Sequence, residues 1–141
     1  MNRYELLSMC KFEEITPQKL ASCDYFECEN KDLNDFFAND AVKYAKRLLG
    51  KTYVFCLKEN PNTIVAAFTV SNDSIRMTNK LNEESKQIFL HDTSLEDKCL
   101  RRFPAVLIGR LATNKNFAGK GIGSGVMDFI KYWFTINNIK L

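Results

Sequence analysis

The chain has 141 residues, of which 45% are hydrophobic and 26% are charged, which is the length and composition of one ordinary soluble globular domain, residues 1–141. The formal net charge of +3 is too small to require a nucleic-acid partner, although it permits one. The apolar runs fall short of the ~20 residues of a membrane-spanning helix, and the first residues lack the pattern of a signal peptide.

The cysteines indicate a reduced, cytoplasmic protein. Their odd number argues against a disulfide framework, and a single histidine, His91, makes a zinc site unexpected. Cys28 could act as a nucleophile, but no placed base supports it, so we favour a buried or incidental thiol. The five are scattered without a C-x-x-C pair: Cys10, Cys23, Cys28, Cys56 and Cys99.

The first half of the chain predicts a strand, a helix and a hairpin. Residues 1–10 give no firm signal, and residues 12–16 form a short first strand that Pro17 ends. A helix runs from an N-cap at Asn30 to a C′ stop at Gly50. Residues 52–57 and 63–71 are rich in β-formers and flank a short turn, which predicts an antiparallel hairpin. The apolar positions of the helix recur at helical spacing: Leu33, Phe36, Phe37, Ala41, Tyr44 and Leu48.

The most apolar run is residues 103–112, which predicts a central strand covered on both faces. Pro104 must lie at its start, because proline cannot donate to a ladder. Gly109 marks a bulge or a close backbone approach, and Arg110 needs either a partner or a site. Before this run, residues 72–101 permit a helical turn or two and then a loop.

A glycine-rich turn, residues 117–125, follows this strand and leads into an amphipathic helix over residues 122–134. Glycines let the backbone curl tightly, and the free N–H groups of a helix's first turn bind anions, so the turn predicts a phosphate or pyrophosphate site. The alternative is a plain corner in which the glycines only relieve crowding. A Walker loop is excluded because Gly121 follows Lys120, and a dinucleotide fingerprint is excluded because the chain leaves little room for its acidic residue.

Residues 139–141 look like the start of another strand, so the predicted fold class is an α/β sandwich with a mixed sheet. The sequence resembles the GNAT family of N-acetyltransferases, in which a strand is followed by the signature Arg/Gln-x-x-Gly-x-Gly/Ala at the start of a helix. Residues 118–123 match this signature, with Ala118 in place of the usual Arg or Gln. The chain is more narrowly similar to the toxin-type GNATs of bacterial toxin–antitoxin pairs, through Phe26–Asn34 at the entry to the first helix and Ile108–Ala112 in the strand.

The resemblance implies the GNAT fold, a mixed central sheet flanked by helices, here lacking the C-terminal strands. It implies an acetyl-CoA-dependent N-acetyltransferase that acts on a primary amine, with aminoacyl-tRNA as the acceptor. The alternatives are a truncated, non-catalytic acetyl-CoA-binding or interaction module and a small-molecule or protein N-acetyltransferase. The implied cofactor-binding residues pair by their backbone with the pantetheine arm (Leu111, Ala112 and Thr113) or hold the pyrophosphate (Ala118, Gly119, Lys120, Gly121, Ile122, Gly123 and Ser124).

The resemblance leaves the catalytic residues unknown. The family's general acid is a tyrosine on a later helix, and Tyr132 lies on the wrong helix to replace it. The implied partners are tRNA and a ribbon-helix-helix antitoxin, and we expect a homo-oligomer to cover the open apolar edge of the central strand. Candidate RNA contacts, for which a solvated surface is at least as good an explanation, are Arg101, Arg102, Lys115 and Lys120.

Overall fold

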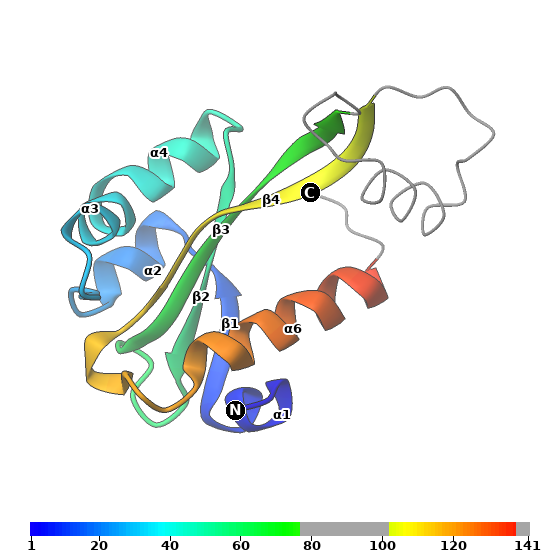
Figure 1. The fold of residues 1–141 in the computed structure, drawn as a ribbon. Helices are drawn as coiled ribbons and strands as arrows, with labels where there is room; N and C mark the ends of the chain where they lie inside the picture. The colour runs from blue at the N-terminus through cyan, green and yellow to red at the C-terminus, as the bar shows by residue number, and fades with distance from the viewer. Residues whose placement is uncertain (77–101, 138–141) are drawn as a thin grey trace. The chain divides into compact units, whose positions relative to one another are not determined.

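The computed structural model describes residues 1–76 and 102–137, which contain a four-stranded sheet with helices on both of its faces (Figure 1). The chain divides into two compact units, one formed by Met1–Ser71 and Ile108–Leu141 and the other by Asn72–Leu107. The second unit holds the ends of two strands, and all the sites discussed below lie in the first. In chain order the elements are α1 (Arg3–Met9), β1 (Cys10–Glu14), α2 (Pro17–Ser22), α3 (Lys31–Asp35), the π-helical segment η1 (Phe36–Asp40), α4 (Ala41–Lys46), β2 (Lys51–Leu57), β3 (Ile64–Arg76), β4 (Arg102–Thr113), the 3-10 turn η2 (Lys115–Phe117) and α6 (Ile122–Asn137).

The strand order is β1-β2-β3-β4, and neighbouring strands run antiparallel (Figure 1). This agrees with the predicted α/β class and with the predicted hairpin, which is β2 and β3. The strand that would make the sheet mixed is predicted to begin at residue 139, outside the described residues. The helical turn expected within residues 77–101 also lies outside them.

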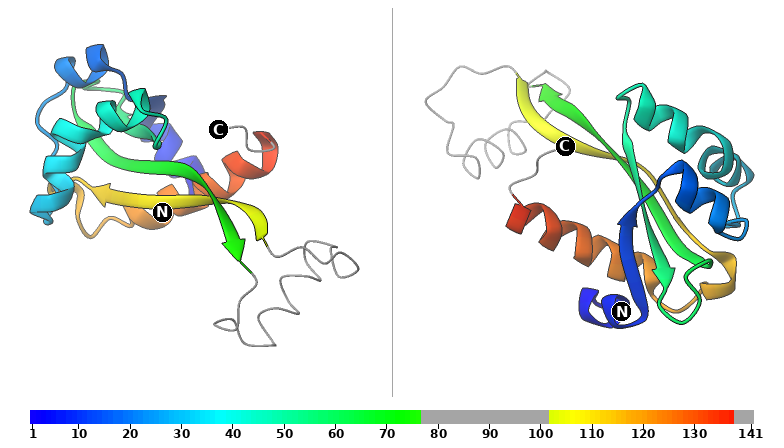
Figure 2. Two further views of the ribbon diagram at one scale, coloured as in Figure 1. Left: turned by 90° about the horizontal axis from the view of Figure 1, so that it is seen from above. Right: turned by 180° about the vertical axis from the view of Figure 1, so that it is seen from behind.

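Residues in neighbouring positions along β2 pack on opposite faces of the sheet, as alternation in a strand requires. Val54 packs in the cluster that holds Phe36 and Phe37 of η1, whereas Phe55 packs against Phe129 of α6 with ring centroids 5.2 Å apart. Figures 1 and 2 show the same division, with α2, α3 and α4 on one face and α1 and α6 on the other. Phe12 of β1 reaches Phe129 as well, at 4.5 Å. The apolar core therefore has two halves, one on each side of the sheet.

Two short helices were not predicted from the sequence, although both have caps. The side chain of Asn2 accepts a hydrogen bond from the Glu5 N–H and begins α1. Thr16 accepts from the Lys19 N–H and begins α2, with Pro17 at its first position. The predicted first strand is β1, which is placed at Cys10–Glu14 instead of 12–16. Both helices are too short to show the apolar periodicity on which the prediction depended.

The predicted helix begins as expected, because Asn30 accepts hydrogen bonds from the N–H groups of Asp32 and Leu33. It is not one regular helix, however, since the π turn η1 separates α3 from α4. The prediction of its end was wrong: the left-handed residue after α4 is Leu48, with φ of 58°, and not Gly50. Gly50 instead lies against the sheet, where an added Cβ would be 3.1 Å from the carbonyl oxygen of Val70.

The apolar strand, which was predicted to be central, lies at the edge of the described part of the sheet, and the strand predicted to flank it begins at residue 139, outside the described residues. β4 is the last strand in the order, so among the described strands it has β3 on one side and an open edge on the other. The apolar run does not indicate the position of the strand in the sheet, because such a run is typical of a strand covered on two faces wherever it lies. Pro104 does lie close to the start of β4. Within the described ranges no helix is long and apolar enough to cross a membrane.

Candidate cofactor-binding site

The glycine-rich turn joins β4 and η2 to α6, in the predicted order of strand, turn and helix. Gly119 and Gly121 have φ of 77° and 76°, in the left-handed region that other residues rarely adopt. An added Cβ at Gly121 would also lie 2.9 Å from the Met1 nitrogen, a distance that real Cβ atoms do not show. These two glycines are therefore required by backbone conformation, and at Gly121 by space as well.

The first turn of α6 presents free N–H groups beside this curl. The first main-chain hydrogen bond into the helix is from the Gly125 N–H to the Gly121 oxygen, at 3.1 Å. In the described part of the chain the N–H groups of Ile122, Gly123 and Ser124 have no acceptor, as is usual at a helix N-terminus. No atom lies within 4 Å of the position of an added Cβ at Gly123, so the approach to these groups is open. The geometry fits an anion such as a pyrophosphate.

Asn114, which sequence reasoning missed, fixes the end of β4 immediately before the turn. It is buried, its N–H donates to the Val65 oxygen at 2.8 Å, and its side-chain amide donates to the Ile64 oxygen at 2.9 Å. Its side-chain oxygen accepts from the Asn116 N–H at 2.9 Å and begins η2. An Asn directly after a strand is a usable signal for such a cap. The turn is therefore anchored to β3 through one side chain.

On its other side the turn is packed against α1. Arg3 donates from its main-chain N–H to one oxygen of Asp128 on α6, at 2.8 Å, and its guanidinium pairs with the other oxygen at 3.3 Å. The guanidinium also lies over the ring of Tyr132, 4.5 Å from its centroid. These contacts hold the start of the chain beside Gly121 and Gly125, whose added Cβ atoms would meet Met1. Tyr132 is thus in contact with α1.

The ten predicted cofactor residues lie around two hollows, one on each side of β4. The first hollow, about 290 Å³, lies between β4 and α3 and brings together Ala112, Thr113 and Ala118. The second, about 740 Å³ and open, lies between β4 and α6 and brings together Leu111, Gly123 and Ser124. Gly119, Lys120, Gly121 and Ile122 form the turn between the end of β4 and the start of α6. The open edge of β4 is therefore bordered by a hollow on each face.

Charged side chains at the first hollow are partly neutralised. Lys115 pairs with Glu27 at 2.9 Å, and its N–H donates to the Glu27 oxygen at 2.9 Å, so this predicted RNA contact already has a partner. Lys120 is exposed, with its ammonium 5.2 Å from the centroid of the Phe117 ring. Of the candidate cations near the turn, Lys120 is the better placed to meet an anion. Arg101 lies outside the described residues.

The segment that resembles the toxin-type GNATs has a structural role here. Asn34 is buried and brackets Cys28, accepting from its N–H at 2.7 Å and donating to its oxygen at 3.2 Å. The Cys28 thiol is buried and donates to the Asn30 oxygen at 3.4 Å. The expectation of a buried thiol is confirmed. The motif shapes the wall of the first hollow, which Cys28, Asn30 and Leu33 line.

Arg110, which was expected to need a partner, lies over the ring of Phe36, 3.8 Å from its centroid, and 5.2 Å from that of Tyr44. The guanidinium is therefore stacked on the helical layer by cation–π contacts. Gly109 is not a close backbone approach, because no atom lies within 4 Å of an added Cβ. The bulge predicted at Gly109 stays a prediction.

The titratable groups that are shifted lie away from the turn. Burial raises the pKa of Cys10 to about 11 and the pKa of Cys56 to about 12, so neither thiol is a ready nucleophile at neutral pH. Burial acts to lower the pKa of Lys19, but its hydrogen bond with Glu13 and nearby negative groups raise that pKa overall. Within residues 1–76 and 102–137 no group of three or more His, Cys, Asp or Glu side chains could hold a metal ion.

No family model matches this sequence, and no curated protein matches it. Solved structures do. AtaT complexed with acetyl-methionyl-tRNAfMet is similar with a TM-score of 0.67 and 20% identity, over 86% of this chain and 66% of that chain. A mutant of KacT matches with a TM-score of 0.66 and 19% identity, over 86% and 66%. AtaTR bound with AcCoA matches with a TM-score of 0.62 and 17% identity, over 95% and 71%.

At these identities the likeness shows the fold alone. The chain spans about two thirds of the length of the AtaT and KacT chains to which it is similar. The fold class predicted from the sequence is confirmed, because a sheet flanked by helices in this order is shared with AtaT and KacT. The chain therefore shares the α/β fold of AtaT and KacT.

Proposed function

We propose that this chain binds acetyl-CoA and is the cofactor-binding part of a toxin-type N-acetyltransferase. The observation that carries the proposal is the pair of left-handed glycines, Gly119 and Gly121, directly before the free N–H groups of α6. Such a site binds phosphate groups, and AtaTR, which shares the fold, is bound with AcCoA. When bound, acetyl-CoA supplies the acetyl group as a thioester.

Each predicted residue has a role in this proposal. The N–H groups of Ile122, Gly123 and Ser124 bind the pyrophosphate, and Lys120 adds a positive charge. The open edge of β4 offers the backbone of Leu111–Thr113 to the amide groups of the pantetheine arm, as a neighbouring strand would. The family's polar side chain is replaced by Ala118, so the backbone carries the binding.

The acceptor we propose is the α-amine of an aminoacyl-tRNA, which would inhibit translation in the cytoplasm. The support is the fold shared with AtaT, which was solved with acetyl-methionyl-tRNAfMet. An antitoxin of the ribbon-helix-helix type is proposed as a partner, on the strength of the KacTA–DNA complex. Cell-free translation tests the acceptor: inhibition by the protein with acetyl-CoA, relieved by peptidyl-tRNA hydrolase, is expected, and a full translation yield would contradict it.

Calorimetry with acetyl-CoA tests the binding site, and Gly123 is the position at which to alter it. Gly123→Glu puts a carboxylate among the N–H groups but meets no atom and lies in the first turn of a helix, where a negative charge is favourable. We expect Gly123→Glu to lose acetyl-CoA binding while its melting temperature stays equal to that of the wild type or rises. Gly123→Ala is the matched control and should bind. Equal binding by wild type and Gly123→Glu would contradict the proposed site.

Catalysis is a separate question from binding, because the described residues that line the two hollows include no tyrosine, and the one thiol among them, that of Cys28, is buried. A non-catalytic acetyl-CoA-binding module is therefore the second candidate function. Release of free CoA in the presence of charged tRNA or small amines separates the two. Turnover that Gly123→Glu abolishes supports the enzyme, whereas binding without CoA release supports the module.

The open edge of β4 also supports the proposal of a homo-oligomer. Unpaired N–H and C=O groups along an apolar strand are a template for another strand. Sedimentation is expected to show a species larger than a monomer. A monomer at all concentrations would contradict this proposal and leave the acetyl-CoA site unaffected.

A further inference from the structure

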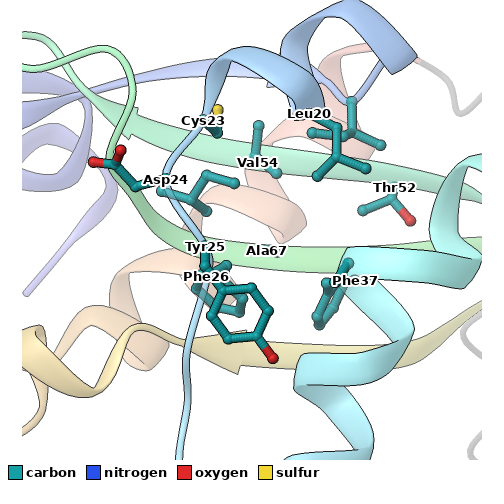
Figure 3. A pocket seen from close by; sticks show the side chains of 12 residues that line it. Leu20, Cys23, Asp24, Tyr25, Phe26, Phe37, Thr52, Val54 and Ala67 are labelled. Carbon is teal, nitrogen blue, oxygen red and sulfur yellow. The ribbon is translucent and has the colours of Figure 1, made fainter.

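A separate cavity, of about 260 Å³, lies on the face of the sheet covered by α2, α3 and η1, and we call it the α2 cavity. Its walls come from well-separated parts of the chain, which Figure 3 shows around one space. None of its residues lines either hollow of the candidate cofactor site. Apolar side chains make up most of the wall: Ile15, Leu20, Phe26, Phe37, Val54 and Ala67.

Much of the wall belongs to the core, whereas Asp24 and Tyr25 are exposed, so the cavity is a pocket that reaches from the surface into packed structure. Phe37 is 5% exposed and Ala67 is 1% exposed, yet both face the space. Protein interiors contain few voids larger than a water molecule, since an unfilled void lowers stability. A cavity of this size that reaches into the core therefore calls for an explanation.

The polar atoms on the wall turn away from the space. The Thr52 hydroxyl lies 2.8 Å from the Thr69 hydroxyl, so it already has a partner within the sheet. In Figure 3 the carboxylate of Asp24 and the thiol of Cys23 also point away from the cluster of Leu20, Val54 and Phe37. Apolar atoms make up the larger part of the wall. The interior selects a neutral, apolar molecule.

The π turn η1 borders the cavity and provides a second, independent observation. Phe37 and Ala38, two of its five residues, line the space. A π turn is rare, interrupts helical hydrogen bonding and is frequent at functional sites. Here the wide turn places the small side chain of Ala38 at the wall, beside the ring of Phe37. The helix is irregular at the place where it meets the cavity.

The mouth of the cavity lies at the segment 23–26, which is tied down on both sides. The Asp24 N–H donates to the Asn62 oxygen at 2.8 Å, and farther along the Lys115 N–H donates to the Glu27 oxygen at 2.9 Å. Tyr25, between these anchors, lines the cavity although it is 64% exposed. The exposed Tyr25 ring therefore places this side of the cavity at the protein surface.

From these observations we propose that the α2 cavity is a binding site for a neutral molecule with a single apolar ring. An apolar cavity of about 150 Å³ stays dry and takes up benzene, so 260 Å³ holds one ring with a small substituent. The site is independent of acetyl-CoA, since the two share no residues. Its ligand is recognised mainly by size and apolarity.

Toluene is the probe, and proton–carbon NMR of the full chain without acetyl-CoA is the measurement. Binding is expected at millimolar concentration, with the largest shift changes at the methyl groups of Leu20, Val54 and Ile64. Methyl groups on the opposite face, such as those of Val65 and Val126, serve as internal controls and should not shift. Absent shifts, or shifts spread equally over both faces, would overturn the proposal.

Ala67→Leu fills the cavity from β3 and should abolish the toluene shifts with no loss in melting temperature, because the added atoms occupy empty space. Ala45→Leu adds the same atoms on α4, outside the cavity, and should leave the toluene shifts in place. If Ala67→Leu does not fold, Ala38→Leu fills the cavity from η1 instead. Toluene shifts that persist in a folded cavity-filled variant would overturn the assignment.

Discussion

The main-chain nitrogen of Met1 lies 2.9 Å from the position that a Cβ on Gly121 would occupy. Two glycines with the same backbone conformation therefore differ in their surroundings, since an added Cβ at Gly119 meets nothing within 4 Å. A substitution at Gly119 therefore adds backbone strain alone, whereas the same substitution at Gly121 adds backbone strain and a clash with Met1.

Gly119→Ala should lower the free energy of unfolding by about 1–2 kcal/mol, the cost of a left-handed conformation for a residue with a Cβ. Gly121→Ala carries the same strain and must also displace Met1, so its loss should be larger by about 1–3 kcal/mol. Urea unfolding of the two variants measures both. Equal losses would show that the start of the chain does not press on the turn.

Removing the carboxylate of Asp128 should loosen α1. Asp128→Ala deletes the acceptor of the Arg3 N–H and one half of a partly exposed ion pair, for an expected loss of about 1–2 kcal/mol after screening by solvent. Asp128→Asn keeps an oxygen for the N–H and should lose less. Urea unfolding at low and high salt measures the charge component, and a loss for Asp128→Asn as large as for Asp128→Ala would contradict this order.

Asn34→Ala should destabilise the fold by about 2–4 kcal/mol, because it leaves the N–H and the oxygen of Cys28 unpaired in the core. Asn39→Ala is the matched control. Its side chain donates to Asp35 at 2.7 Å on the exposed face, and its removal should cost less than about 0.5 kcal/mol. Thermal unfolding compares them, and similar costs would mean that the bracket around Cys28 is not a core contact.

Stability should fall as the pH rises above about 9, the ordinary pKa of a thiol. The unfolded chain ionises its thiols there, whereas the folded pKa of Cys10 is about 11 and that of Cys56 is about 12. The stability contributed is therefore complete below pH 9 and is lost as the pH approaches these folded values, at about 1 kcal/mol per pH unit for each thiol.

Urea unfolding at several pH values measures this slope under reducing conditions. Through packing, Cys56→Ala changes the free energy of unfolding by the same amount at every pH. It should also flatten the slope of that free energy against pH, since one of the two shifted thiols is gone. A slope unchanged in Cys56→Ala would contradict the assignment of the pH dependence to burial of that thiol.

The sequence predicted those elements that have strong local causes. Asn30 begins its helix as expected because its side chain accepts hydrogen bonds from the N–H groups of Asp32 and Leu33 in the first turn. Gly119 and Gly121 were predicted to curl the backbone, and both do. In each case the residue type alone favours the conformation, so no knowledge of the rest of the fold is needed.

What the sequence could not provide depends on contacts between distant residues. The edge position of β4 is decided by which strands pair, and its apolar pattern does not encode that. The division of the predicted cofactor residues between two hollows follows from the strand's two faces and from the helices that happen to cover each. Asn114 was missed because its partners, Ile64 and Val65, are about 50 residues away.

The π turn η1 has a consequence for comparing this chain with relatives. Its bonds span five residues instead of four, so it contains one residue more than the same length of α-helix. A relative with a regular helix would therefore align with a one-residue gap at Phe36–Asp40, and a gap placed elsewhere would shift Ala41 and Tyr44 off the buried face. The position of a single gap in an alignment thus identifies which relatives share this feature of the helix.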